Sequence, residues 1–208
     1  MPIKRPEQLS LDLPSLSSPG RRRVAKISSE NLFFGIVPEP DIAARAIDLM
    51  QRFGAAAFRL QGKFYQPERL HVTLNFLGAY PILREDIVFA AMQAGASIAI
   101  APFSVTFDRL ASFETGPNGA LVLRCAAGTR QLTILHRAID EALAYFAVHP
   151  GRRASFVPHL TLFRGRNSID ETRLDEPLTW TVREFKLIHS LYGRSQHKHI
   201  ERWPLLEQ

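Results

Sequence analysis

Two short segments of the sequence carry the same four-residue pattern of histidine, any residue, threonine and leucine. The first begins at His71 and the second at His159, and each lies in an apolar stretch that is typical of a β-strand. Because side chains alternate across a strand, the histidine and threonine of each copy should share one face. Each copy therefore presents an imidazole, which exchanges protons near neutral pH, beside a hydroxyl that can hydrogen-bond a phosphate oxygen.

Two such faces predict in-line displacement at phosphorus. This reaction needs one group to deprotonate the entering oxygen and another to protonate the leaving oxygen across the phosphoryl group. We expect His71 and His159 to supply both roles without a metal or cofactor. We expect Thr73, Thr161 and the cation Arg164 to bind the non-bridging oxygens. A single copy would more often be a core histidine, but two copies, each followed by leucine and an early glycine, favour a site.

Other chemistries have weaker support in the sequence. For His197 and His199, near the C-terminus, we favour a solvated segment over a metal site. The polar segment that contains them, residues 193–201, could equally line the cleft or form a solvated hairpin, so we name no site residue there. Neither motif has the three or four ligands of a tight metal site. Cys125, in an apolar run, should be buried as a small hydrophobe. Phe64 and Tyr65 either pack in the core, which we favour, or stack on a base.

Phosphate-loop, dinucleotide-binding and serine-elbow patterns are absent from the sequence. The net charge of +6 and the pI near 9.9 favour an anionic partner. The apolar runs are far shorter than the roughly 20 residues of a membrane-spanning helix, and the first residues lack the apolar centre of a signal peptide. We therefore expect a cytoplasmic protein that does not enter a membrane.

The surrounding pattern predicts one α+β domain, residues 30–208, after a disordered basic tail, residues 1–29, that is rich in serine, proline and arginine. Helical periodicity predicts three helices, of which the first should end at Gly54. Strands and helices interleave, so a two-lobed fold whose lobes meet at the repeated motif is the simplest architecture. The helices are expected near residues 42–53, 84–96 and 129–146, and the strands near 31–37, 70–77, 103–107, 120–126, 156–163, 178–182 and 185–192.

The two motifs, HVTLNFLG at residues 71–78 and PHLTLFR at residues 158–164, resemble those of the two-histidine (2H) phosphoesterase superfamily. Within it they are similar to the RNA 2',3'-cyclic phosphodiesterase or 2'-5' RNA ligase branch, over most of the chain after the tail. The resemblance implies a bilobal pseudo-two-fold fold of two antiparallel sheets with outer helices and a central basic cleft. It also implies metal-independent hydrolysis of RNA 2',3'-cyclic phosphate ends to 2'-phosphomonoesters, with 2'-5' RNA ligation as the related reaction.

By this resemblance His71 is the general acid for the leaving 3'-oxygen, and His159 is the general base for water. Thr73 and Thr161 hold the phosphate, and Arg164 matches the arginine of the second motif. A substrate bound the other way round would exchange the two histidines. Two alternatives stay open: a phosphodiesterase for 2',5'-oligonucleotides or other nucleotides, and a module that binds RNA ends without catalysis. The partners expected are thus RNA ends or nucleotide phosphodiesters; the sequence indicates no protein partner.

Overall fold

The computed structural model describes residues 30–57, 62–113, 119–125, 129–149, 155–166, 168–191 and 196–206. The predicted tail, residues 1–29, lies outside this part of the chain. The helices are α1 (Pro40–Ala57), α2 (Glu85–Ala96), α3 (Thr129–Tyr145) and the short 3-10 helix η1 (Pro67–Arg69). The strands are β1 (Glu30–Ile36), β2 (Gly62–Phe64), β3 (Val72–Tyr80), β4 (Phe103–Phe113), β5 (Gly119–Arg124), β6 (His159–Gly165), β7 (Thr172–Val182), β8 (Glu184–Leu191) and β9 (Gln196–Pro204).

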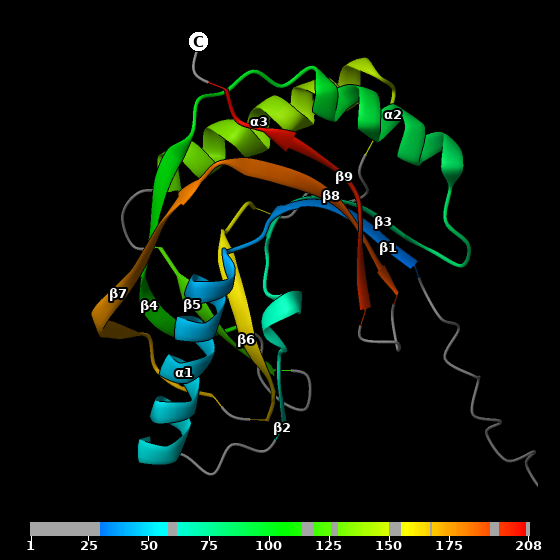
Figure 1. Ribbon diagram of the computed structural model, residues 1–208. Coiled ribbons are helices and arrows are strands. Elements are labelled where there is room, and N and C mark those ends of the chain that lie inside the picture. The colour runs from blue at the N-terminus through cyan, green and yellow to red at the C-terminus, as the bar shows by residue number, and fades with distance from the viewer. Residues whose placement is uncertain are drawn as a thin grey trace, which may run out of the picture.

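The described strands form one antiparallel arrangement in the order β7-β4-β5-β6-β3-β1-β8-β9, with β2 beside β6 (Figure 1). It divides between β6 and β3 into two halves, β7-β4-β5-β6 together with β2, and β3-β1-β8-β9. A single registered pair, Val72 with Leu160, joins the halves. The predicted α+β class is confirmed, and the two predicted sheets are the two halves of this strand order, which meet at the repeated motif.

The helices pack against both halves and leave one face of the motif strands to the site. α1 contacts β6 and β7, α2 and α3 contact each other, α2 contacts β8 and β9, and α3 contacts β3 and β4 (Figure 1). Of the apolar stripe expected for the third helix, Leu132, Leu135, Ile139 and Leu143 are fully buried, whereas Phe146 is half-buried and follows the end of α3. Burial of these side chains is the main favourable term that holds α3 on the sheet.

Several elements differ from the predictions: β4 and β7 are longer than expected and β2 was not predicted, and two further differences have a clear physical reason. α1 continues through Gly54 to Ala57, so the prediction that Gly54 ends the helix is wrong. A glycine costs a helix only about 1 kcal/mol relative to alanine, and the alanines that follow are the best helix formers. The second difference is β9, which forms where a solvated segment was favoured. β9 pairs with the open edge of β8, and an edge strand tolerates polar side chains on its exposed face.

Candidate active site

The strand pairing brings the two motif copies together at their centres. His71 directly precedes β3, His159 begins β6, and Val72 pairs with Leu160. Extending this antiparallel register by one residue in each direction places His71 opposite Thr161 and Thr73 opposite His159. The intervening side chains of Val72 and Leu160 are fully buried, whereas both histidines and both threonines are half-buried. The four predicted side chains therefore share one face of the sheet, the histidine face.

A β-bulge brings Arg164 to the same face. The neighbouring residues Leu121 and Val122 of β5 pair with Phe163 and Thr161 of β6. β6 therefore has one extra residue directly after Thr161. Strict alternation from His159 would turn Arg164 toward the core. An extra residue reverses the alternation beyond the bulge, so Arg164 lies on the histidine face and is exposed.

The first motif copy has a bulge at the matching position, which supports the internal two-fold repeat. The register of β1 against β3 shifts between Phe34 and Gly35, directly after Thr73. The residue that corresponds to Arg164 is then Phe76, with 49% of its surface exposed. The two halves of the site are thus alike in backbone but differ in chemistry, because one offers a cation where the other offers an aromatic ring.

The backbone holds the two catalytic candidates in the same tautomer. His71 Nδ1 donates to the carbonyl oxygen of Arg69 at 2.8 Å, and His159 Nδ1 donates to that of Val157 at 2.8 Å. A carbonyl oxygen only accepts, so Nδ1 must carry the proton in each neutral ring. Nε2 is then the ring atom that can take up or release the proton exchanged with a substrate.

Aromatic rings from the neighbouring strands pack on both imidazoles. The ring centroids of Phe33, on β1, and His71 are 4.8 Å apart, and those of Phe113, on β4, and His159 are 4.6 Å apart. These matched contacts restrict the orientation of each imidazole. The two histidines therefore have equivalent supports in the two halves of the sheet.

A third histidine, His197 of β9, stands beside the first. Its ring packs edge-on against His71 with 4.9 Å between centroids, and it lies 5.8 Å from the ring of Phe33. Arg69 Nη2 lies 3.5 Å from His197 Nε2, and since a guanidinium only donates, that nitrogen accepts. The interpretation of His197 as a solvated residue is wrong: the pairing of β9 with β8 carries it to the site. The polar, basic composition of residues 193–201 was the only signal in the sequence.

Burial makes the histidines of the site hard to protonate in the free protein. It lowers the pKa of His71 to about 4, and the nearby charges of Arg69, His159 and His199 add to the effect. Burial likewise lowers the pKa of His197 to about 3. The pKa of His159 is lowered by burial and by the cations Arg164 and Arg124.

The sequence matches the 2'-5' RNA ligase superfamily over residues 38–194, which include both motif copies and the strands that pair them. The chain belongs to this superfamily. The RNA 2',3'-cyclic phosphodiesterase of Aquifex aeolicus (strain VF5) is 28% identical over 121 residues, 58% of this chain and 63% of that relative. The match thus spans less than two thirds of the relative.

Solved structures show the same fold. E. coli LigT complexed with 3'-AMP superposes with a TM-score of 0.69 at 24% identity, covering 86% of this chain and 99% of that one. A protein of Thermus thermophilus superposes with a TM-score of 0.64 at 23% identity, covering 84% of this chain and 97% of the other. At these identities the likeness establishes the fold alone.

In this superfamily member Tyr65 links two of the site's cations, and Phe64 is partly exposed. Arg164 Nε donates to Tyr65 Oη at 3.2 Å, and the guanidinium of Arg69 lies over the Tyr65 ring, 5.0 Å from its centroid. Phe64 contacts the Phe163 ring at 5.2 Å between centroids but keeps 38% of its surface exposed. Tyr65 thus packs against the hydrophobic core, as favoured, and also contacts both arginines, whereas Phe64 faces solvent in part.

The remaining sequence candidates lie away from this chemistry. Cys125 is buried, as predicted, and its burial raises the pKa of the thiol to about 12. Within the described ranges no cluster of three or more histidine, cysteine, aspartate or glutamate side chains could hold a metal ion. Among the same residues no helix is both long and apolar enough to span a membrane.

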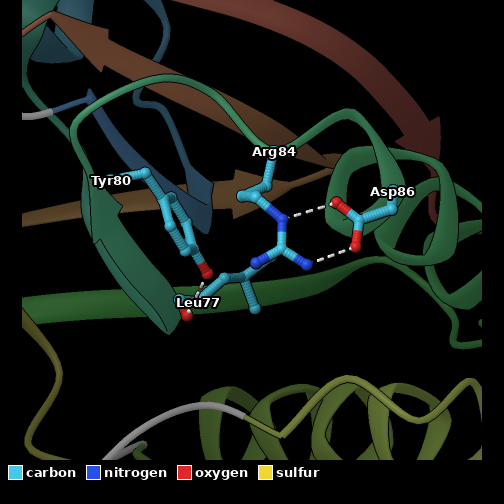
Figure 2. A network of polar contacts seen from close by, with 4 residues as sticks. All are labelled: Leu77, Tyr80, Arg84 and Asp86. Atoms are coloured by element: carbon cyan, nitrogen blue, oxygen red, sulfur yellow. Dashed lines mark hydrogen bonds and ion pairs between the residues drawn. The ribbon is translucent and has the colours of Figure 1, made fainter.

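A hollow of about 360 Å³ lies at the far end of β3, between α2 and the segment after α3. Figure 2 shows how its polar side chains are engaged: Arg84 donates to both carboxylate oxygens of Asp86, at 2.8 and 2.5 Å, and Tyr80 Oη donates to the Leu77 carbonyl at 2.9 Å. The arginine lowers the pKa of Asp86 to about 2. These contacts tie the start of α2 to the preceding loop.

Proposed function

We propose that this chain hydrolyses the 2',3'-cyclic phosphate ends of RNA to 2'-phosphomonoesters, with His71 and His159 as its acid-base pair. The observation that carries the proposal is the pairing of Val72 with Leu160, which sets the two histidine-threonine pairs diagonally across one strand junction. The superfamily match and the activity named for the Aquifex relative support the same reaction.

In the proposed reaction, water attacks the phosphorus while the bond from phosphorus to the 3'-oxygen breaks. One imidazole accepts a proton from the water at Nε2, and the other donates a proton from Nε2 to the leaving 3'-oxygen. The product keeps the phosphate on the 2'-oxygen. Ligation through a 2'-5' linkage is the same displacement with an RNA hydroxyl in place of water.

The phosphate would be held by Thr73, Thr161 and Arg164. Each threonine lies opposite the histidine of the other copy, so the two hydroxyls converge on the phosphate between the imidazoles. Arg164 reaches this face through the bulge after Thr161 and is oriented by Tyr65. A cation here stabilises the charge that develops on the non-bridging oxygens.

The order of the two histidines is the part of the mechanism on which resemblance and structure differ. The implied order makes His71 the acid, yet a pKa of about 4 leaves this imidazole neutral at pH 7 in the free protein. His71 can serve in that order only if the bound phosphate anion draws a proton to it. In the reverse order His71 is already neutral and able to act as base, while His159, whose pKa is also lowered, must take up a proton when the phosphate anion binds. We propose this reverse order, because the shift of the pKa of His71 is the large one.

The decisive experiment measures turnover of a nucleoside 2',3'-cyclic phosphate with EDTA present. We expect His71→Ala and His159→Ala each to lower kcat/KM by roughly 10²- to 10⁴-fold, the usual contribution of a general acid or base. His149→Ala, at an exposed histidine after α3, is the matched control and should retain full activity. Near-normal turnover by either active-site variant would refute the acid-base pair.

The pH dependence of kcat/KM tests the protonation states. Because the pKa values of His71 and His159 are both lowered, both limbs of the profile should lie below the ordinary histidine value of 6.5. As pH rises toward 6.5, kcat/KM should fall because the acid loses its proton. As pH falls toward about 4, kcat/KM should also fall because the base gains a proton. Rate profiles in buffers of constant ionic strength provide the measurement, and a profile whose limbs lie above pH 6.5 would contradict it.

The two other functions predict different results in the same assays. A phosphodiesterase for 2',5'-linked oligonucleotides would cleave those linkages and spare the cyclic phosphate. A module that only binds RNA ends would show saturable binding without turnover, and its affinity would survive loss of a titratable group at His71 or His159. The exposed Phe76 and Phe64 are surfaces on which a base can stack in any of these cases.

A further inference from the structure

Three arginines lie side by side on the histidine face and lead away from His159. In the register of the sheet His159 on β6 pairs with Arg124 on β5, Arg124 pairs with Arg109 on β4, and Arg109 pairs with Arg173 on β7. Residues directly opposite each other in antiparallel strands project on the same side of the sheet. The three side chains, here called the arginine row, therefore continue the active-site face to the edge of the sheet.

Side-chain contacts confirm the direction of the row. The guanidinium carbon of Arg124 lies 5.5 Å from the centroid of the Phe113 ring, which itself contacts the His159 ring. The side chains of Arg109 and Arg124 are 34% and 36% exposed, and Arg173 is exposed. The row is thus open to solvent and in contact with the residues that support His159.

Like charges directly opposite in a sheet oppose folding, so the row does not serve stability. Two carboxylates moderate the repulsion without removing it: Glu171 lies 2.6 Å from Arg124, and Asp108 lies 3.9 Å from Arg109. On the opposite half of the sheet, Lys186 on β8 lies directly opposite Arg202 on β9 in the strand register. The carboxylate of Glu184 forms ion pairs with both cations, at 2.9 and 4.0 Å. Fixed cations in a line favour a polyanion.

The row has the length of a short nucleic-acid segment. Neighbouring strands are about 4.8 Å apart, so three strand spacings from His159 to Arg173 cover about 14 Å. At about 3.4 Å per nucleotide of a stacked strand, this distance corresponds to roughly four nucleotides. Arginine, with its planar fork of donors, is the side chain best suited to phosphate oxygens.

We propose that the arginine row binds the backbone phosphates of an RNA strand whose end lies at His71 and His159, so that this enzyme prefers oligonucleotide ends to mononucleotides. The inference rests on the proposed function for the position of the RNA end. It adds the substrate class and the direction of the strand, from the strand junction toward the β7 edge.

The test measures how affinity for a single-stranded RNA of about six nucleotides, ending in the product 2'-phosphate, depends on salt. Each phosphate contact on a single strand contributes about 0.7 to the slope of log affinity against log salt. Arg173→Gln and Arg109→Gln should each reduce the slope by about 0.7, and together by about 1.4. Arg137→Gln, which removes the same charge from the exposed side of α3, should leave the slope unchanged.

Turnover assays separate this inference from the proposed function. Arg173→Gln should raise KM for an RNA oligonucleotide with a cyclic phosphate end and leave kcat/KM for a nucleoside 2',3'-cyclic phosphate unchanged. Arg173 is exposed on an edge strand, so its replacement does not threaten folding. If the wild-type protein has no cyclic phosphodiesterase activity, the proposed function is refuted. The salt slopes would still test whether the arginine row binds RNA.

Three results would overturn the inference. The first is an unchanged salt slope for Arg173→Gln, and the second is an equal change for Arg137→Gln, which would indicate net charge alone. The third is a larger change of the salt slope for Arg202→Gln, on β9 at the opposite edge of the sheet. That result would place the RNA strand on the other half of the sheet.

Discussion

The two candidate catalytic histidines have matching supports but different neighbours. Each donates from Nδ1 to a carbonyl two residues earlier and packs on a phenylalanine from a nearby strand. Beside His71 stand the neutral ring of His197 and the cation Arg69, whereas His159 faces two cations, Arg124 and Arg164. The pseudo-symmetric backbone thus carries an asymmetric pair, which is what a reaction with one acid and one base requires.

For the single residue His197, we predict that its ring keeps water from His71. His197→Ala should hydrate His71 and raise the pKa of its imidazole from about 4 toward 6.5, because burial is the main cause of the low value. His197→Phe should keep the ring packing and leave that pKa low. Titration of the ring protons by NMR measures both, with Lys198→Ala on the opposite face of β9 as control. An unchanged pKa of His71 in His197→Ala would show that His197 does not shield it.

The elements that hold the site are tied together by close packing between α2 and β9. A Cβ atom built at Gly95 of α2 would lie 2.6 Å from the indole of Trp203 on β9. The indole stacks on Phe185 at 5.2 Å between centroids and contacts Phe34 at 5.7 Å. The absence of a side chain at Gly95 therefore allows β9, and with it His197, to pack against this half of the sheet.

We predict that Gly95→Ala destabilises the protein although alanine is the better helix former. An ordinary glycine-to-alanine change within a helix gains up to about 1 kcal/mol, but overpacking costs about 1–3 kcal/mol. The ring contacts of the indole with Phe185 and Phe34 oppose its movement away from a new methyl group. Urea unfolding should show a lower free energy of unfolding, while Gln93→Ala, exposed on the same helix, should show little change. Equal or greater stability of Gly95→Ala would mean that Trp203 can shift.

For the whole molecule, the buried histidines link stability to pH. The folded-state pKa values of about 4 for His71 and about 3 for His197 lie below the unfolded value near 6.5. The unfolded chain therefore binds more protons between these values, and protonation favours unfolding. The contribution of the two neutral rings to stability is complete above pH 6.5 and is lost as pH falls through about 4 and 3.

We accordingly expect the free energy of unfolding to fall between pH 7 and pH 4, and His197→Phe to reduce that dependence by removing one of the two groups. Urea titrations at pH 7.5, 5.5 and 4.5 on the wild type and this variant provide the comparison. If the two pH dependences coincide, His197 is not titrating as its burial requires.

The sequence alone was enough to find the two motif copies, the superfamily and the class of fold. The repeated histidine-threonine pattern, the shared face of each pair and the buried stripe of α3 follow from local periodicity, and local periodicity survives in the structure. The three helices were likewise predicted, with an error at Gly54, where a weak local stop signal was outweighed by the alanines beyond it.

Only the tertiary structure decided which distant residues join the two motifs. His197 reaches the site because β9 pairs with β8, the bulge after Thr161 depends on the register against β5, and the arginine row exists because β7, β4 and β5 are neighbours. Strand order and register are set by contacts between residues far apart in the chain. A period-two pattern states which side chains share a face of one strand, but it carries no information about which strand lies beside it.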